Sequence, residues 1–200
     1  WPYCSFPMLW RSFKMNPTDS QIAFRLRKLK TAFTRFDVDK DGFISKEDFE
    51  LMAKRMNKLG NATAEQAAAC HTSFMQVADF FGYKHGERLP REQAAEDMHE
   101  VMLKLSFEEQ RSLCDKFYYP IFDAVDSNGD GHISFEEYKV YAKTIAPDLT
   151  DEDKVKSFNL IDANKDGEIS REEFLDAAYE YFYSFEENEL TEAFYGPLVA

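Results

Sequence analysis

One pattern of 12 residues occurs three times in this chain of 200 residues, and it restricts the possible fold more than any other feature. The copies read DVDKDGFISKED at 37–48, DSNGDGHISFEE at 126–137 and DANKDGEISREE at 162–173. Each copy has oxygen-bearing side chains at alternate positions, followed by a glycine, an isoleucine and a terminal acidic residue. A unit that recurs in this way predicts a modular fold built from similar elements.

Amphipathic helices are predicted on both sides of the first copy. The helix before it starts near Thr18 to Ser20, and its apolar residues step by three and four along one face: Ile22, Leu26, Leu29, Phe33 and Phe36. Its other face is expected to be solvated, and the residues there are basic: Arg25, Arg27, Lys28 and Lys30. The helix after the copy is expected to stop at Gly60, and its apolar stripe is Phe49, Met52, Met56 and Leu59.

Three pairs that match the capping box indicate further helices: Thr63 with Gln66, Ser106 with Glu109, and Thr150 with Asp153. The repeated unit is therefore a helix–loop–helix hand, and the predicted fold class is all-α. We number the loops along the chain, so that the three copies are loops 1, 3 and 4.

The interval between loops 1 and 3 has room for a second hand. Aligning Leu89 with Ile44 places loop 2 between Gly82 and Gln93, neither of which offers an anionic ligand. We predict that this hand is structurally retained but binds no metal, and that Leu89 pairs with Ile44.

The spacing of the oxygens explains what loops 1, 3 and 4 can bind. A hard divalent cation takes about six to eight oxygen ligands, and loop positions 1, 3, 5, 7, 9 and 12 can supply them. Glycine at position 6 allows the sharp turn. No Cys or His side chain occupies a ligand position, which favours Ca²⁺. The predicted ligands, with position 7 contributing its backbone carbonyl, are Asp37, Asp39, Asp41, Phe43, Ser45 and Asp48 in loop 1, Asp126, Asn128, Asp130, His132, Ser134 and Glu137 in loop 3, and Asp162, Asn164, Asp166, Glu168, Ser170 and Glu173 in loop 4.

Loop 1 differs from the other two because it ends in Asp48 where they end in glutamate. The aspartate side chain is one methylene shorter, so the loop has to contract or lose one ligand oxygen. Four inward carboxylates are expected to offset that loss: Asp37, Asp39, Asp41 and Asp48. A tighter, six-coordinate site is also closer to what Mg²⁺ requires. We therefore predict three calcium sites, with Mg²⁺ competing chiefly at loop 1.

Composition excludes several other classes of function. The net charge of -13 and the pI of about 4.8 favour cations as partners and disfavour nucleic acid and membrane surfaces. The three cysteines are widely spaced, which indicates reduced thiols and a cytoplasmic location. No nucleophile motif, phosphate loop or metal-binding histidine spacing is present, so we predict that the chain is not an enzyme. We expect it to act as a monomer.

The predicted organisation has three parts. Residues 1–20 form an N-terminal extension that is expected to be partly disordered, with Met15 as a candidate start; the alternative is an arm that packs Trp1 and Trp10 onto the domain. Residues 21–105 form the N-terminal pair of hands, and residues 106–200 form the C-terminal pair with its tail.

These stretches resemble the EF-hand superfamily, and within it two groups of four-hand proteins. One group is the invertebrate sarcoplasmic calcium-binding proteins, and the other is the calcium-triggered luciferin-binding proteins of cnidarians. The resemblance runs from about Gln21 to the C-terminus and rests on LKTAFTRFDVDKDGFISKEDFE, APDLTDED, DANKDGEISREEFL and EAFYGPLV. It implies a compact domain whose two pairs of hands share an interior closed by the tail, Phe194 to Val199. That interior is packed side chains in the first group and holds coelenterazine in the second.

Three functions are consistent with this resemblance. We place a sarcoplasmic-type calcium buffer first, because the aromatic content of 16% is more typical of a dense core than of a cavity. The alternative is calcium-triggered binding and release of coelenterazine, an apolar small molecule, for which the run YEYFYSFEE could form a wall. A calcium sensor that binds target helices through methionines ranks third, and its candidates are Met52, Met56, Met75, Met98 and Met102.

Overall fold

In the computed structural model, residues 17–59 and 63–199 are described. The N-terminal extension, with Met15 and both tryptophans, and the predicted stop at Gly60 lie outside these residues. The described part is mostly helical, which confirms the predicted fold class. Its elements in chain order are α1 (Asp19–Phe36), β1 (Phe43–Ser45), α2 (Lys46–Leu59), α3 (Ala64–Phe80), β2 (Arg88–Pro90), α4 (Arg91–Lys104), α5 (Phe107–Val125), β3 (His132–Ser134), α6 (Phe135–Ile145), α7 (Asp151–Ile161), β4 (Glu168–Ser170), α8 (Arg171–Tyr183) and α9 (Glu189–Ala193).

The helices begin where the capping patterns predict. Thr63, Ser106 and Thr150 each accept a hydrogen bond from the backbone N–H three residues later, and the side chain of that third residue bonds back to the cap. Thr18 makes the same box with Gln21 at the start of α1. Each box satisfies backbone N–H groups that a helix start leaves without partners. The three predicted boxes are confirmed.

Two short antiparallel ladders join the hands in pairs. β1 pairs with β2 so that Ile44 lies opposite Leu89, and β3 pairs with β4 so that Ile133 lies opposite Ile169. The predicted pairing of Leu89 with Ile44 is confirmed, so the second hand keeps its structural role. Both isoleucines of the second ladder and Ile44 are fully buried, which fixes the register of each pair.

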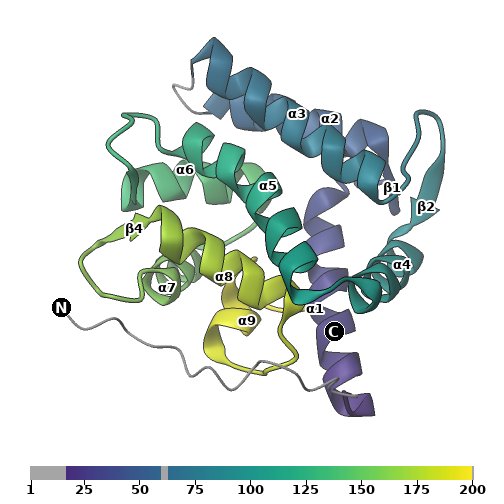
Figure 1. The fold of residues 1–200 in the computed structure, drawn as a ribbon. Helices are drawn as coiled ribbons and strands as arrows, with labels where there is room; N and C mark the ends of the chain where they lie inside the picture. Colours follow the sequence, from purple (N-terminus) through teal and green to yellow (C-terminus); the bar gives the residue numbers. More distant parts are fainter. Residues whose placement is uncertain (1–16, 60–62, 200) are drawn as a thin grey trace.

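The two pairs of hands pack against each other through their helices (Figure 1). α2 and α3 lie side by side, α3 packs on α5, and α5 packs on α8, while α1 contacts both α4 and α8. One continuous core results, and it includes Phe33, Phe122, Phe174 and Tyr181. The chain between the pairs is part of this core, because α5 carries several of its aromatic residues.

One face of α1 differs from the prediction. Arg27 is exposed as expected and Lys30 is half-buried, but Arg25 and Lys28 are only 1% and 0% exposed. An apolar stripe identifies one buried face only, and α1 is covered on a second side by α8 and the segment after it. The long aliphatic stems of arginine and lysine can be buried in such a contact. The predicted solvation of these two residues was therefore wrong.

The C-terminal segment folds back over α1, and Figure 1 shows the chain end beside that helix. Val199 donates its N–H to Thr31 Oγ1 at 3.0 Å, and Arg27 Nε donates to the Val199 carbonyl at 2.7 Å. Phe194 and Tyr195 are buried. The tail therefore covers the interior between the two pairs of hands.

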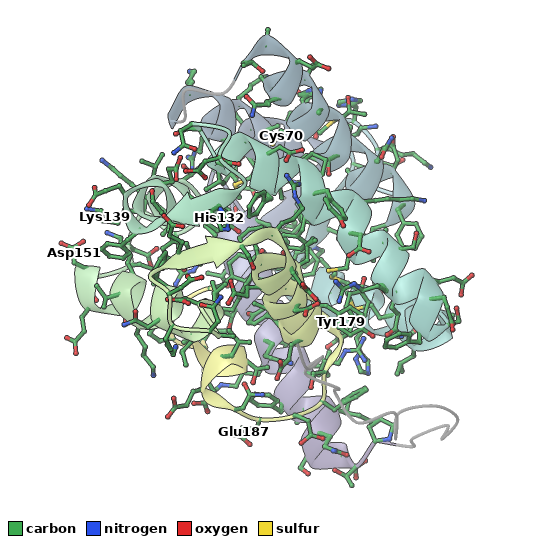
Figure 2. All side chains as sticks on the ribbon, turned by 60° about the vertical axis from the view of Figure 1, so that its left-hand side comes forward. Cys70, His132, Lys139, Asp151, Tyr179 and Glu187 are labelled. Atoms are coloured by element: carbon green, nitrogen blue, oxygen red, sulfur yellow. The ribbon has the colours of Figure 1, made fainter. Side chains whose placement is uncertain are left out.

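Acidic side chains such as Asp151 and Glu187 project from the outside of the molecule (Figure 2). Within the described residues, no helix is long and apolar enough to cross a membrane.

Candidate functional site: three loops and an aromatic chamber

Loops 1, 3 and 4 share one network of internal hydrogen bonds. In loop 4, Asp162 accepts a bond from the Asp166 N–H at 3.2 Å through Oδ1 and from the Gly167 N–H at 3.0 Å through Oδ2. Asp37 and Asp126 make the matching bonds in loops 1 and 3. The side chains at positions 3 and 5 accept further backbone bonds in all three loops. The backbone and the oxygen-bearing side chains of each loop thus hold one another in place.

The terminal carboxylate of each loop ties its beginning to its end. Glu137 accepts from the Ser127 N–H and the Ser134 N–H, both at 2.9 Å. Asp48 reaches the equivalent groups, the Val38 N–H at 3.0 Å and the Ser45 N–H at 2.9 Å. The shorter side chain therefore spans the same two positions, which requires its carboxylate to lie closer to its own backbone. Asp48 is buried, whereas Glu137 is half-buried.

Three carboxylates of loop 1 come together. One oxygen from each of Asp37, Asp39 and Asp48 lies within 4.8 Å of the other two. Asp41, which we expected to be a fourth inward carboxylate, does not belong to this group. Its Oδ1 accepts the Phe43 N–H, and its Oδ2 lies 3.3 Å from Arg88 NH1. Asp41 therefore lies outside the group of three and pairs with a cation of the second hand, and its role as a fourth inward carboxylate stays a prediction.

The pKa values of two terminal carboxylates, Asp48 and Glu137, are shifted in opposite directions. Burial raises the pKa of Asp48, the negative charge of Asp39 adds to the rise, and the hydrogen bonds from Ser45 and Val38 only partly oppose it. Burial also acts to raise the pKa of Glu137, but hydrogen bonds from Ser134 and Ser127 outweigh it and lower that pKa. At the predicted ligand positions, loop 1 has four carboxylates and loop 3 has three, so a cation would relieve more repulsion in loop 1.

The donor set of each loop fits a hard cation. Every side chain at positions 1, 3, 5, 9 and 12 offers oxygen, and the position-7 residues Phe43, His132 and Glu168 each begin a strand. Ser134 and Ser170 also cap the helices that leave loops 3 and 4. Such all-oxygen sets suit Ca²⁺ and, in a tighter site, Mg²⁺.

The second hand contributes charge to loop 1, a role that the sequence analysis missed. Besides the contact between Arg88 and Asp41, Arg91 NH1 lies 3.3 Å from Asp37 Oδ2. His85 contacts Glu47 on α2. The basic residues of loop 2 were visible in the sequence. Only the pairing of β1 with β2 shows which acidic residues they contact.

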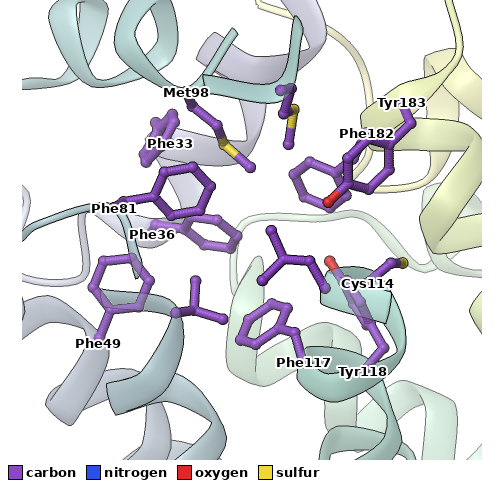
Figure 3. A pocket seen from close by; sticks show the side chains of 13 residues that line it. Phe33, Phe36, Phe49, Phe81, Met98, Cys114, Phe117, Tyr118, Phe182 and Tyr183 are labelled. Carbon is purple, nitrogen blue, oxygen red and sulfur yellow. The ribbon is translucent and has the colours of Figure 1, made fainter. Parts of the chain in front are cut away.

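An aromatic chamber lies between the two pairs of hands (Figure 3). The free space within it is about 30 Å³, which has room for water but not for an organic ligand. Helices from both pairs form its wall, whose residues are Phe33, Phe36, Phe49, Val77, Phe81, Met98, Met102, Leu113, Cys114, Phe117, Tyr118, Phe182 and Tyr183. Phe182 and Tyr183 belong to the run YEYFYSFEE, which therefore forms part of a wall as the alternative function requires.

Polar groups meet behind the wall at the tail. Tyr118 and Tyr195 share a hydrogen bond of 2.6 Å between their hydroxyl oxygens. Burial raises the pKa of both hydroxyls. Burial also raises the pKa of the wall residue Cys114, so its thiol stays protonated at neutral pH.

The paired hands and oxygen-lined loops define a calcium-binding protein of the EF-hand class. A family model for an EF-hand domain pair matches residues 119–179, and one for a single EF hand matches residues 28–56.

Two curated proteins are similar to most of the chain. The luciferin-binding protein of Renilla reniformis is 39% identical over 182 residues, covering 91% of this chain and 98% of that protein. A sarcoplasmic calcium-binding protein of Hediste diversicolor is 34% identical over 127 residues, covering 62% of this chain and 71% of that protein.

Among solved structures, the coelenterazine-binding protein of Renilla muelleri in its calcium-loaded apo form superimposes with a TM-score of 0.75. The two chains are 40% identical, and the match covers 91% of this chain and 100% of that chain. The chain belongs to the EF-hand calcium-binding family that contains the luciferin-binding and sarcoplasmic calcium-binding proteins. The names of these relatives describe binding proteins and not catalysts.

Proposed function

We propose that this chain is a calcium-controlled carrier of a coelenterazine-type luciferin, the function that the sequence analysis placed second. The observation that carries the proposal is the position of loop 1 between two residues of the chamber wall. Phe36 immediately precedes Asp37, and Phe49 immediately follows Asp48. A change in the shape of this loop must therefore move two wall residues of the aromatic chamber.

Loop 3 has a similar connection to the chamber. α5 carries Cys114, Phe117 and Tyr118 of the wall, and its last turn runs directly into Asp126, whose N–H bonds to the Phe122 carbonyl. When bound, calcium supplies positive charge that draws the oxygens of a loop together. The terminal carboxylate then holds the first turn of the following helix to the loop, so loop closure repositions helices that line the chamber.

The small size of the chamber is consistent with the released state of such a carrier. A luciferin needs a pocket of about 300 Å³ or more, and the free space here is about 30 Å³. The carrying state must therefore be wider than this one. A relative of known structure on which this chain superimposes, the coelenterazine-binding protein of Renilla muelleri, is a calcium-loaded apo form.

The same small volume supports the second candidate function, a calcium buffer with a filled core. Ligand binding distinguishes the two. Calcium-free protein is mixed with coelenterazine, binding is followed by absorbance and fluorescence, and calcium is then added. We expect binding at micromolar concentration or tighter that calcium reverses. No binding in either state would refute the carrier and leave the buffer.

We further propose that loops 1, 3 and 4 each bind one calcium ion through the predicted ligands. Glu173→Gln removes one carboxylate oxygen at the end of loop 4 and should reduce the calorimetric stoichiometry from three ions to two. Glu172→Gln, at the exposed neighbouring position, should leave it at three. An unchanged count in the Glu173 variant would contradict the assignment of this loop.

A further inference from the structure

Three buried basic side chains, Arg25, Lys28 and His99, lie near one end of the chamber, and none of the described residues forms an ion pair with them. Arg25 on α1 is 1% exposed, yet its Nε and one terminal nitrogen, NH2, have no hydrogen-bond partner in the part of the chain that the structure describes. His99 on α4 is 7% exposed, and its Nδ1 also has no partner among those residues. Lys28 is fully buried one turn along α1 from Arg25.

Aromatic rings lie against this cluster, and the carboxylates of Glu180 and Glu100 act on Lys28 and His99 only as electrostatic neighbours, without an ion pair. The Arg25 guanidinium lies 4.6 Å from the centre of the Phe185 ring, and the His99 ring meets the same phenylalanine edge-on at 6.4 Å. Lys28 donates its one hydrogen bond to the Ser184 carbonyl at 2.8 Å. Within residues 17–59 and 63–199, none of the three forms an ion pair with an acidic side chain. Residues 1–16 and 60–62 contain no Asp or Glu that could do so.

An arrangement of this kind is costly to the folded state. A buried charge without a partner loses hydration and regains little of it from aromatic faces. Burial lowers the pKa of Arg25 to about 10 and that of Lys28 to about 7. A chain under no other constraint gains stability by replacing such an arginine with an apolar residue, so its presence needs another reason.

The cluster adjoins the aromatic chamber. Tyr183, a wall residue, is an electrostatic neighbour of Arg25. Met98, another wall residue, directly precedes His99 on α4. Met98 and Tyr183 both lie in the upper half of the chamber in Figure 3. Arg25, Lys28 and His99 are not themselves wall residues, but Arg25 and His99 each neighbour a residue that is.

We infer that Arg25, supported by His99 and Lys28, forms an anion-recognition site at this end of the chamber for an aromatic ligand that carries a negatively charged oxygen. This inference deepens the proposed carrier function and rests on it for the identity of the natural ligand. The guanidinium donates to the anionic oxygen through Nε and NH2, while the chamber holds the rings. A ligand that brought its own anion would satisfy the donors that the fold leaves free.

Two dyes that share one ring system test the inference independently of any luciferin. Anilinonaphthalene sulfonate carries the anion, and N-phenylnaphthylamine lacks it; both are titrated by fluorescence into the calcium-free protein. Arg25→Met should weaken binding of the sulfonate by about tenfold or more and change binding of the neutral dye by less than about twofold. Its unfolding temperature should equal or exceed that of the native protein.

Matched variants separate this effect from general damage. Lys30→Met removes one positive charge from the same helix and should change the affinity for neither dye. If Arg25→Met does not fold, Arg25→Gln is titrated in its place. If Arg25→Met weakened binding of both dyes equally, or of neither dye, the inference would be overturned.

The coelenterazine titration distinguishes this inference from the proposed function. If the sulfonate preference depends on Arg25 and coelenterazine does not bind, the luciferin assignment fails and the anion site stands. If coelenterazine binds equally to the native and Arg25→Met proteins and no sulfonate preference exists, the carrier stands and the anion site is refuted.

Discussion

At the scale of single residues, we expect the short side chain of Asp48 to decide how loop 1 selects its ion. Its carboxylate bridges the Val38 and Ser45 N–H groups as Glu137 bridges those of Ser127 and Ser134. Asp48 keeps both of these hydrogen bonds. Its shorter side chain, however, leaves both carboxylate oxygens close to the backbone and less able to extend toward an ion. Such a contracted loop offers fewer oxygens and suits a smaller cation.

Asp48→Glu should therefore raise the preference of loop 1 for calcium over magnesium, by about tenfold if one further oxygen reaches the ion. Calcium titrations with and without millimolar magnesium measure this preference. The reverse change at loop 3, Glu137→Asp, should lower the preference there. Identical magnesium competition in the native and Asp48→Glu proteins would refute the account of the shorter side chain.

Lys28 provides a second test at this scale, because burial lowers its pKa to about 7, with the charge of Arg25 adding to the fall and Glu180 opposing it. Between this value and its usual value of 10.5, the unfolded chain holds a proton that the folded protein has released. The free energy of unfolding should therefore rise with pH across this interval, by up to about 1.4 kcal/mol per pH unit from this one group.

Lys28→Met should remove that contribution, so that the variant gains stability relative to the native protein at pH 7 and loses this advantage by about pH 10. Chemical denaturation at a series of pH values measures the two curves. Lys30→Met, at a half-buried position on the same helix, is the control. Parallel curves for the native and Lys28→Met proteins would contradict the buried, deprotonating lysine.

At the scale of elements, the second hand acts as a source of positive charge for loop 1. Its strand β2 pairs with β1, and this register brings Arg88 to Asp41 and Arg91 to Asp37, each at 3.3 Å. Both acids are predicted calcium ligands. A fixed positive charge beside them weakens the attraction of a cation and competes for Asp41 directly.

Arg88→Gln should therefore tighten calcium binding at loop 1 by about two- to fivefold, a modest gain because the Arg88 side chain is 62% exposed. The gain should shrink at high salt, which screens exposed charges. Calorimetric titration at two salt concentrations measures both effects. Lys84→Gln, in the same loop but paired with Glu87, should have no effect. An unchanged affinity in the Arg88 variant would refute the competition.

The elements also show how far sequence reasoning reaches. The loops and the capping boxes depend on local spacing, and the pairing of Leu89 with Ile44 follows from aligning the repeated pattern, so the sequence was sufficient to predict them. The contacts of Arg88 with Asp41 and of Arg25 with Phe185 join distant segments. The apolar periodicity of α1 identifies one buried face, but it contains no information about a second face that another part of the chain covers. Cavity size likewise depends on packing and not on aromatic content.

At the scale of the whole molecule, the tail contacts both pairs of hands and covers their interior. Arg35 on α1 donates to the Tyr195 carbonyl at 3.3 Å, and Ser157 on α7 donates to the Ala193 carbonyl at 2.5 Å. The Tyr195 ring packs on Phe36 and Tyr181. Since Phe36 is also a wall residue, docking of the tail and the shape of the chamber are coupled.

Gly196 makes this docking possible. Its φ of +83° is strained for any other residue, and a Cβ there would lie 2.1 Å from Leu149 Cδ2. Gly196→Ala must therefore displace Leu149 or release the tail. We expect a loss of about 1 to 3 kcal/mol in the free energy of unfolding, or about 3 to 10 °C in the unfolding temperature.

The control for this variant is Gly82→Ala, because Gly82 has a similar φ of +79° and open space around its Cβ position. Gly82→Ala should lower the free energy of unfolding through backbone strain alone, and so by less than Gly196→Ala does. If the tail also seals the chamber, coelenterazine bound to the calcium-free protein should dissociate faster from Gly196→Ala than from Gly82→Ala. Equal stability and equal dissociation rates in the two variants would mean that the tail covers the interior without closing it.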